Sequence, residues 1–240
     1  MRIYYLDNSG FAVIVGGSLL VFDYYHDIGS TLEKGFSRGV VPRDELSRFE
    51  RVYFFVSHSH FDHYNRMIFS LGRENPNTKF IIDVGIIKPP EEAVRMGIDA
   101  EYRDDFLYAR RCPSTDIGAS FYVEAGGYSL FHAGDLNCWH WHGQATEAEE
   151  LTNRHNFTEA LSYIKRSVAP TMDVAFFPID TRLEGPYDDG VIEFVREFSP
   201  KLLVPMHFQN DFSVPRRFAA KSPVPVFEIA RRGDSIEFTK

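Results

Sequence analysis

The chain has 240 residues, a length that suits one domain, and we expect residues 1–240 to form a single folded unit. A hydrophobic content of 44% with 25% charged residues excludes a disordered chain. The formal net charge of −8 argues against a nucleic-acid backbone as the main partner, because proteins that bind one carry a basic face.

The first half of the chain is predicted to be rich in strands. Runs of β-branched and aromatic residues alternate with Gly, Asn and Asp, which favour hairpin turns. The predicted strands are 3–6, 11–15, 19–24, 52–56 and 80–84. Between them, residues 26–48 have a loop-like composition, with a short helix starting at Pro42. A second short helix is predicted over 91–96.

The second half alternates strands with helices. Residues 121–124 and 128–132 flank Ala125-Gly126-Gly127 and are predicted to form a hairpin. Apolar residues three and four apart predict helices over 158–168 and 190–198, and the continuous apolar runs 174–179 and 202–206 predict buried strands. The order contains no linker, so we expect one layered α/β domain with helices outside two sheets.

Cysteine usage and hydropathy restrict the compartment. Cys112 and Cys138 do not form a Cys-x-x-Cys pair, which excludes a cysteine-rich zinc site. Few cysteines and the absence of a signal-peptide pattern favour free thiols in a reducing compartment, and we expect a cytoplasmic protein. No apolar stretch approaches the ~20 residues that span a bilayer.

The segment His58-Ser59-His60-Phe61-Asp62-His63 directly follows the predicted buried strand 52–56. It holds four potential metal ligands, of the imidazole and carboxylate types that divalent metals prefer. Residues two apart in an extended segment face the same way, so His58 and His60 are expected to bind one ion together. A turn beginning at Phe61 would direct Asp62 and His63 toward a second ion.

This segment is similar to the HxHxDH signature of the metallo-β-lactamase superfamily. Three further segments resemble the superfamily in the same order, namely 20–23, 131–135 and 205–207. The resemblance extends from residue 1 to about residue 210. It implies an α/β fold, a four-layer αβ/βα sandwich of the metallo-β-lactamase type, with a dinuclear metal site at the sheet edge.

The resemblance also implies a role for each matching residue. The implied metal ligands are His58 and His60 for the first ion, Asp62, His63 and His207 for the second, and Asp135 between both. Asp23 would orient a histidine ligand through a hydrogen bond. From the residues alone, Asp135 could instead be a helix N-cap and Asp23 a turn residue. Asp180 ends a predicted core strand, and we expect it to support the site as Asp23 does.

One ligand of the superfamily has no obvious counterpart. The superfamily usually supplies a third histidine to the first ion, but this chain has no histidine between His63 and His132. Asp116 could substitute as an oxygen ligand, or His132, His140 or His142 could reach the ion. Otherwise the first ion is weakly held, or only one ion binds.

Two tryptophans and two histidines follow the Asp135 position at once, namely Trp139, His140, Trp141 and His142. We expect them either to form a substrate-binding wall or to form a rigid packing corner.

The predicted function is a metal-dependent hydrolase that uses a metal-bound hydroxide on a small ester, lactone or phosphodiester. A bound divalent ion lowers the pKa of water to about 7, and Asp62 would orient this nucleophile or accept its proton. Zn²⁺ is the expected ion, as one or two copies, and Mn²⁺ or Fe²⁺ use the same ligand types. The alternatives are a catalytically degenerate binding or sensory protein with one or no metal, and a redox enzyme using iron in the same pocket.

Overall fold

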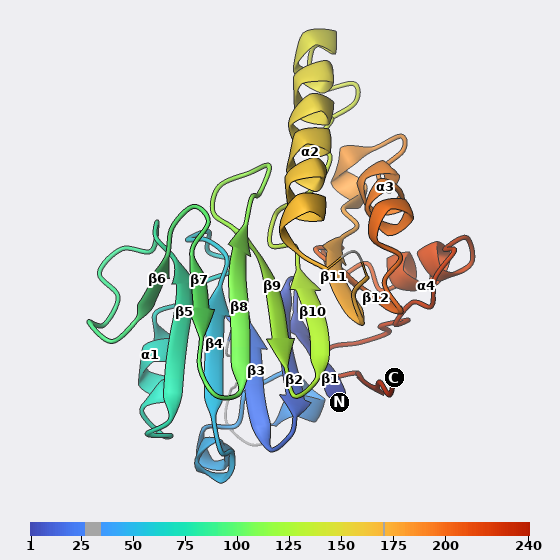
Figure 1. Cartoon of the computed structure of the whole chain (residues 1–240). Coiled ribbons are helices and arrows are strands. Elements are labelled where there is room, and N and C mark those ends of the chain that lie inside the picture. The colour runs from blue at the N-terminus through green and yellow to red at the C-terminus, as the bar shows by residue number, and fades with distance from the viewer. Residues whose placement is uncertain (27–34, 170) are drawn as a thin grey trace.

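The structure is a computed structural model that describes residues 1–26, 35–169 and 171–240 (Figure 1). Its strands form two sheets. The first sheet has the order β13-β1-β2-β3-β4-β5-β6, with β1 (Arg2–Asp7), β2 (Gly10–Val15), β3 (Ser18–Phe22), β4 (Val52–Val56), β5 (Thr78–Asp83), β6 (Val94–Met96) and β13 (Ser235–Glu237). The second has the order β12-β11-β10-β9-β8-β7, with β7 (Glu101–Arg103), β8 (Leu107–Cys112), β9 (Ser120–Ala125), β10 (Tyr128–His132), β11 (Val174–Pro178) and β12 (Leu202–Met206).

Each sheet has an antiparallel part and a parallel part. Strands β1 to β3 pair antiparallel through short turns, whereas β3 to β6 pair parallel. In the second sheet β7 to β10 are antiparallel, and β10 to β12 are parallel. Every residue of β4, β11 and β12 is buried, which explains their continuous apolar sequences.

Helices cover the outer faces of the sheets. They are α1 (Met67–Gly72), α2 (Glu147–Ser167), α3 (Asp189–Phe198) and α4 (Ser213–Ala219), with 3₁₀ helices η1 (Phe36–Arg38), η2 (Arg43–Arg48) and η3 (Thr181–Leu183). The rings of Phe131 in β10 and Phe194 in α3 stack at 5.3 Å, so α3 packs on the second sheet. On the opposite side, residues of η2 and α1 join the outer face of the first sheet in a separate apolar cluster.

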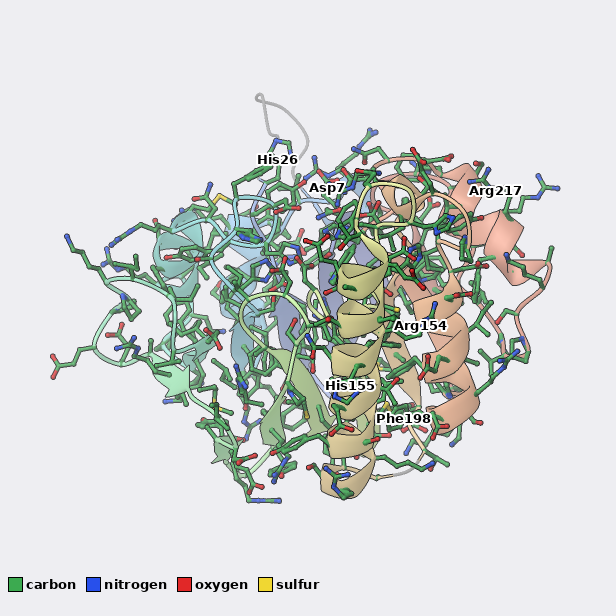
Figure 2. All side chains as sticks on the ribbon, turned by 90° about the horizontal axis from the view of Figure 1, so that it is seen from above. Asp7, His26, Arg154, His155, Phe198 and Arg217 are labelled. Atoms are coloured by element: carbon green, nitrogen blue, oxygen red, sulfur yellow. The ribbon has the colours of Figure 1, made fainter. Side chains whose placement is uncertain are left out.

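The main core lies between the two sheets. Aromatic pairs join them, such as Phe55 with Phe121 at 5.5 Å and Phe11 with Phe176 at 4.7 Å. The result is the predicted α/β sandwich of two sheets with helices outside both. In the view from above, His155 of α2 and Arg217 of α4 lie at the outer surface (Figure 2).

Some predicted elements differ from the structure. The predicted helix over 91–96 is wrong, because Val94–Met96 forms β6 and pairs with β5. The helix expected at 158–168 begins at Glu147, where Thr146 and Glu149 form a reciprocal capping box. The helix expected at Pro42 is a 3₁₀ helix. Among the described residues, no helix is long and apolar enough to cross a membrane.

Candidate metal centre

The candidate ligands lie in loops that directly follow three strands. His58, His60, Asp62 and His63 follow β4, Asp135 follows β10, and His207 follows β12. Strand β4 belongs to the first sheet, whereas β10 and β12 belong to the second. The site is therefore assembled at the edge where the two sheets meet.

These six side chains form two groups. One contains His58, His60 and Asp135, and the other contains Asp62, His63 and His207. Within each group, one ligand atom from each residue lies within 4.8 Å of the others. The structure thus brings together all six residues that the sequence singled out.

The carboxylate of Asp135 lies between the two groups. Its Oδ2 atom is 3.3 Å from Nε2 of His58, and its Oδ1 atom is 3.0 Å from Nε2 of His63. The same Oδ1 atom is 3.6 Å from Nε2 of His207. Each carboxylate oxygen therefore faces a different group, which is the placement a bridging ligand needs.

Two buried carboxylates orient the histidine rings. Oδ2 of Asp23 lies 2.8 Å from Nδ1 of His63, and Oδ2 of Asp180 lies 2.9 Å from Nδ1 of His207. When Nδ1 donates to a carboxylate, the lone pair on Nε2 is left for a metal. Asp23 also accepts hydrogen bonds from the backbone and hydroxyl of Ser57, which fix its own position.

Backbone strain occurs at the same site. Asp23 and His207 have φ values of 43° and 59°, in the left-handed region that non-glycine residues rarely adopt. Each such residue costs about 1–2 kcal/mol, and strained residues of this kind cluster at functional sites. Both positions terminate a strand, and the reversal directs each side chain into the ligand cluster.

Two buried atoms support the fit to a cation. Nε2 of His63 and Oδ1 of Asp135 are buried and face each other at 3.0 Å, yet neither makes a well-formed hydrogen bond in the part of the chain that the structure describes. Buried polar atoms without partners are uncommon in native proteins, and a divalent ion held by imidazole nitrogen and carboxylate oxygen would satisfy both. The donor set therefore fits a divalent metal.

Electrostatics favour positive charge at this position. Burial acts to lower the pKa of His63, but the carboxylates of Asp135 and Asp23 raise it well above its usual value. Burial also acts to lower the pKa of His207, but hydrogen bonds with Asp180 and Asp62 raise it to about 9. The pKa of Asp62 falls to about 2, since hydrogen bonding with His207 and the charge of His63 outweigh burial.

His132 does not reach the ligand groups. Its Nε2 lies 2.9 Å from the carbonyl oxygen of Ser9, and its Nδ1 accepts from the backbone N–H of Gly134 at 3.2 Å. The ring stacks on Phe22 inside the core, and this burial lowers its pKa. Both nitrogens are occupied, so the suggestion that His132 could replace the missing histidine is wrong.

His140 and His142 also point elsewhere. Nδ1 of His140 accepts from the backbone N–H of His142, and its Nε2 lies 3.4 Å from the carbonyl oxygen of Pro186. His142 contacts Glu150 of α2 at 3.3 Å. Both histidines line a separate small cavity beside α2 rather than the pocket at the ligand groups.

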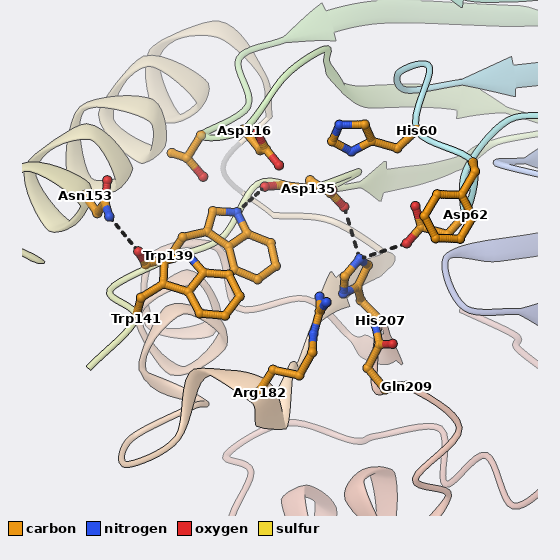
Figure 3. Close-up of a pocket in the computed structure, with 12 residues that line it drawn as sticks. His60, Asp62, Asp116, Asp135, Trp139, Trp141, Asn153, Arg182, His207 and Gln209 are labelled. Atoms are coloured by element: carbon orange, nitrogen blue, oxygen red, sulfur yellow. Dashed lines mark hydrogen bonds and ion pairs between the residues drawn. The ribbon is translucent and has the colours of Figure 1, made fainter. Parts of the chain in front are cut away.

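The pocket above the ligand groups has a volume of about 510 Å³ (Figure 3). Its walls include Asp116, Trp139 and Trp141, and Asp116 belongs to neither ligand group. Five lining residues were not predicted as site residues: Phe61, Thr115, Asn153, Arg182 and Gln209. All of them except Asn153 lie within two residues of a predicted site residue, which is a local signal.

The loop that carries Asp116 is tightly packed against the metal-ligand loop. The backbone N–H of Ala119 donates to the carbonyl oxygen of Ser57 at 3.0 Å. Gly118 has a φ of 84°, and a Cβ there would collide with Ser57 O and His58 Cβ. Glycine at this position allows the two loops to approach closely.

No family model matches the chain, and no curated protein matches it by sequence. Solved structures do match. Igni18, a metallo hydrolase from the archaeon Ignicoccus hospitalis, is 18% identical, with a TM-score of 0.65 over 99% of both chains. The metallo-β-lactamase fold protein YhfI from Bacillus subtilis is 12% identical, with a TM-score of 0.60 over 98% of both chains.

A third match is CmlA, a diiron β-hydroxylase from Streptomyces venezuelae. It is 11% identical, with a TM-score of 0.59 over 94% of this chain and 52% of CmlA. The likeness to these three structures is a likeness of fold.

Proposed function

We propose, from the metallo-β-lactamase fold of this chain and the two ligand groups at its sheet edge, that the protein is a metal-dependent hydrolase. The proposed ligands are His58, His60 and Asp135 for one divalent ion, and Asp62, His63 and His207 for the other. The observation that supports this most is the position of Asp135. Its buried Oδ1 atom makes no well-formed hydrogen bond among the described residues and lies 3.0 Å from the ligand nitrogen of His63.

A divalent ion held by these residues supplies Lewis acidity, both to water and to the carbonyl or phosphoryl oxygen of a substrate. The protein's own residues orient the reactants. Nδ2 of Asn8 donates to Oδ2 of Asp62 at 3.1 Å, and the pKa of about 2 keeps this carboxylate charged. Asp62 is therefore proposed to accept a hydrogen bond from the attacking water and to orient it.

Asp116 is the proposed replacement for the absent third histidine. It lines the pocket next to His60, and its side chain is exposed to that space (Figure 3). A carboxylate at this position would add an oxygen ligand to the group of His58, His60 and Asp135. Zn²⁺ is the first candidate, and Mn²⁺ and Fe²⁺ are the alternatives, because all three ions accept imidazole and carboxylate ligands.

The experiment is metal analysis combined with a hydrolysis screen. Purified protein is assayed for metal content per chain and for hydrolysis of generic phosphodiesters, lactones and esters. His60→Ala is expected to bind less metal and to lose at least about tenfold in kcat/KM. His155→Ala is the control, because His155 lies on the exposed face of α2.

Equal activity in wild type and His60→Ala would refute the proposed centre. A protein that binds no metal under replete conditions and hydrolyses none of these substrates would instead support a degenerate binding or sensory protein. A small substrate is proposed because the pocket has a volume of about 510 Å³.

A further inference from the structure

The pocket wall contains one side chain with a fixed positive charge. Arg182 lies in η3, two residues after Asp180, and projects into the pocket between Trp141 and His207 (Figure 3). We propose that Arg182 binds an anionic group of the substrate, a carboxylate or phosphoryl oxygen. This inference rests on the proposed function and names the substrate class of the same pocket.

One edge of the guanidinium is already held by the protein. Nε lies 3.0 Å from both oxygens of Asp180, and Nη2 lies 2.5 Å from Oδ2. Asp180 is fully buried, so it holds Arg182 in a fixed orientation. Within the described part of the chain, no acceptor contacts Nη1, and 51% of the side chain is exposed. A fork of N–H donors therefore remains for a ligand, in the geometry that arginine uses for carboxylates and phosphates.

Next to Arg182 is a rigid aromatic surface. The rings of Trp139 and Trp141 stack at 5.8 Å with 14° between their planes, and Cζ of Arg182 lies 5.9 Å from the Trp141 centroid. Trp139 is fixed at two points: Nε1 donates to the carbonyl oxygen of Asp135, and its own carbonyl oxygen accepts from Asn153. A flat apolar group of a ligand can pack on this surface while its anionic group contacts Arg182.

The charges of the pocket favour this assignment. Apart from the histidines of the ligand groups, its other charged side chains are the carboxylates Asp62, Asp116 and Asp135. Two of them belong to the proposed ligand groups, where bound cations would neutralise them. Arg182 is then the only lysine or arginine among the lining residues. If Arg182 only neutralised Asp180, the Nε and Nη2 edge would be sufficient. That role does not account for Nη1, which faces the pocket without an acceptor among the described residues.

The test uses equilibrium binding, so that it does not depend on turnover. Both tryptophans of the chain line this pocket, so intrinsic fluorescence reports directly on its occupancy. The probes are phenyl phosphate and benzoate, with phenol and benzyl alcohol as neutral partners of the same ring. Each is titrated into the protein as purified and after metal removal by a chelator, because the second titration excludes direct binding to an ion.

The variants are Arg182→Gln and, as a matched control, Arg217→Gln. Arg217 lies on α4 at the outer surface (Figure 2). Its side chain is 52% exposed and forms an ion pair with Asp211 at 3.3 Å. We expect Arg182→Gln to weaken binding of at least one anionic probe tenfold or more, with and without metal. Binding of the neutral probes and the metal content should stay within about twofold, and Arg217→Gln should change neither.

The two anionic probes distinguish a phosphoryl group from a carboxylate. If Arg182→Gln loses affinity for phenyl phosphate alone, the substrate group is a phosphoryl group; if it loses affinity for benzoate alone, the group is a carboxylate. Equal weakening of anionic and neutral probes would overturn the proposal, since Arg182 would then act only by positioning Asp180. Unchanged anion affinity in Arg182→Gln would overturn it as well. Absence of hydrolysis, by contrast, would refute the proposed function and leave the binding result in place.

Discussion

Oδ2 of Asp180 lies 2.9 Å from Nδ1 of His207 and 2.5 Å from Nη2 of Arg182. One buried carboxylate therefore orients both a proposed metal ligand and the proposed anion-binding group. Its burial is tolerated because both partners donate to it, and together they lower its pKa despite the burial.

Asp180→Asn should weaken metal binding about 10- to 100-fold, because an uncharged amide neither polarises the His207 ring nor neutralises the charge of Arg182. Competition with a chromophoric chelator measures the change. Asp173→Asn is the control: Asp173 is also a buried carboxylate but hydrogen-bonds to Ser129 and Lys201, outside the pocket. Equal metal affinity in wild type and Asp180→Asn would contradict the role assigned to Asp180.

Metal binding should release protons. Because the pKa of His207 is raised to about 9, its ring carries a proton near neutral pH before a cation enters, and the raised pKa of His63 favours a second proton there. The metal must displace these protons, so its apparent affinity should rise with pH until about pH 9. The folding stability of the metal-free protein depends on pH in the opposite direction. The contribution of His207 to this stability is fully present below pH 6.5 and is lost as the pH rises through about 9.

Calorimetry in two buffers of different ionisation enthalpy counts the protons released, and we expect at least about one per chain near neutral pH. A titration enthalpy that is independent of the buffer would contradict this prediction.

Gly118→Ala should damage both the fold and the metal centre. Its φ of 84° already disfavours a side chain, and the new Cβ would collide with Ser57 and His58. Gly143 is a matched comparison, because its φ is 75° and nothing lies within 4 Å of the position of a Cβ. Gly143→Ala should cost about 1–2 kcal/mol, the left-handed backbone penalty alone. Gly118→Ala should lower the free energy of unfolding by more than this and should also reduce the metal content. Urea unfolding and metal analysis measure the two effects. Equal effects of Gly118→Ala and Gly143→Ala would argue against the close packing of the two loops.

Asp173 should contribute to stability above acidic pH. Although its burial acts to raise the pKa, Lys240, Lys201 and the backbone of Ser129 lower it. A lowered folded-state pKa means that the contribution is fully present above about pH 3.8 and is lost as the pH falls through the folded value. Asp173→Asn should therefore cost about 1–3 kcal/mol near pH 7, with the difference shrinking below pH 3.8 in urea unfolding. A pH-independent difference would contradict it.

Part of the ligand groups was predicted from the residues themselves, because four ligands lie within six residues after a continuous apolar strand. Asp180 was predicted from its position at a strand end, whereas the roles of Asp135, His207 and Asp23 were implied only by the resemblance to the superfamily. The error at His132 could have been avoided by the same kind of reasoning. Side chains alternate along a strand, so His132 shares the inward face of Leu130 in β10, whereas Phe131 faces α3.

Other features depend on contacts that no local pattern contains. The short strand β6 was predicted as a helix, because a few apolar residues fit both the helical and the strand periodicity. Only its pairing with β5 distinguishes the two. Arg182 was missed as a site residue although it lies two residues after Asp180. Its importance comes from Trp141, about forty residues earlier in the chain, and only the fold brings the two together.

The origin of the ligands in two different sheets has a mechanical consequence. His58, His60, Asp62 and His63 follow a strand of the first sheet, and Asp135 and His207 follow strands of the second. A cation bound to both sets would cross-link the halves of the sandwich at their open edge, as a disulfide would in an oxidising compartment. Catalytic competence and resistance to unfolding would then depend on the same ions, and at a free metal concentration of 100 times Kd the bound state gains about 2.7 kcal/mol.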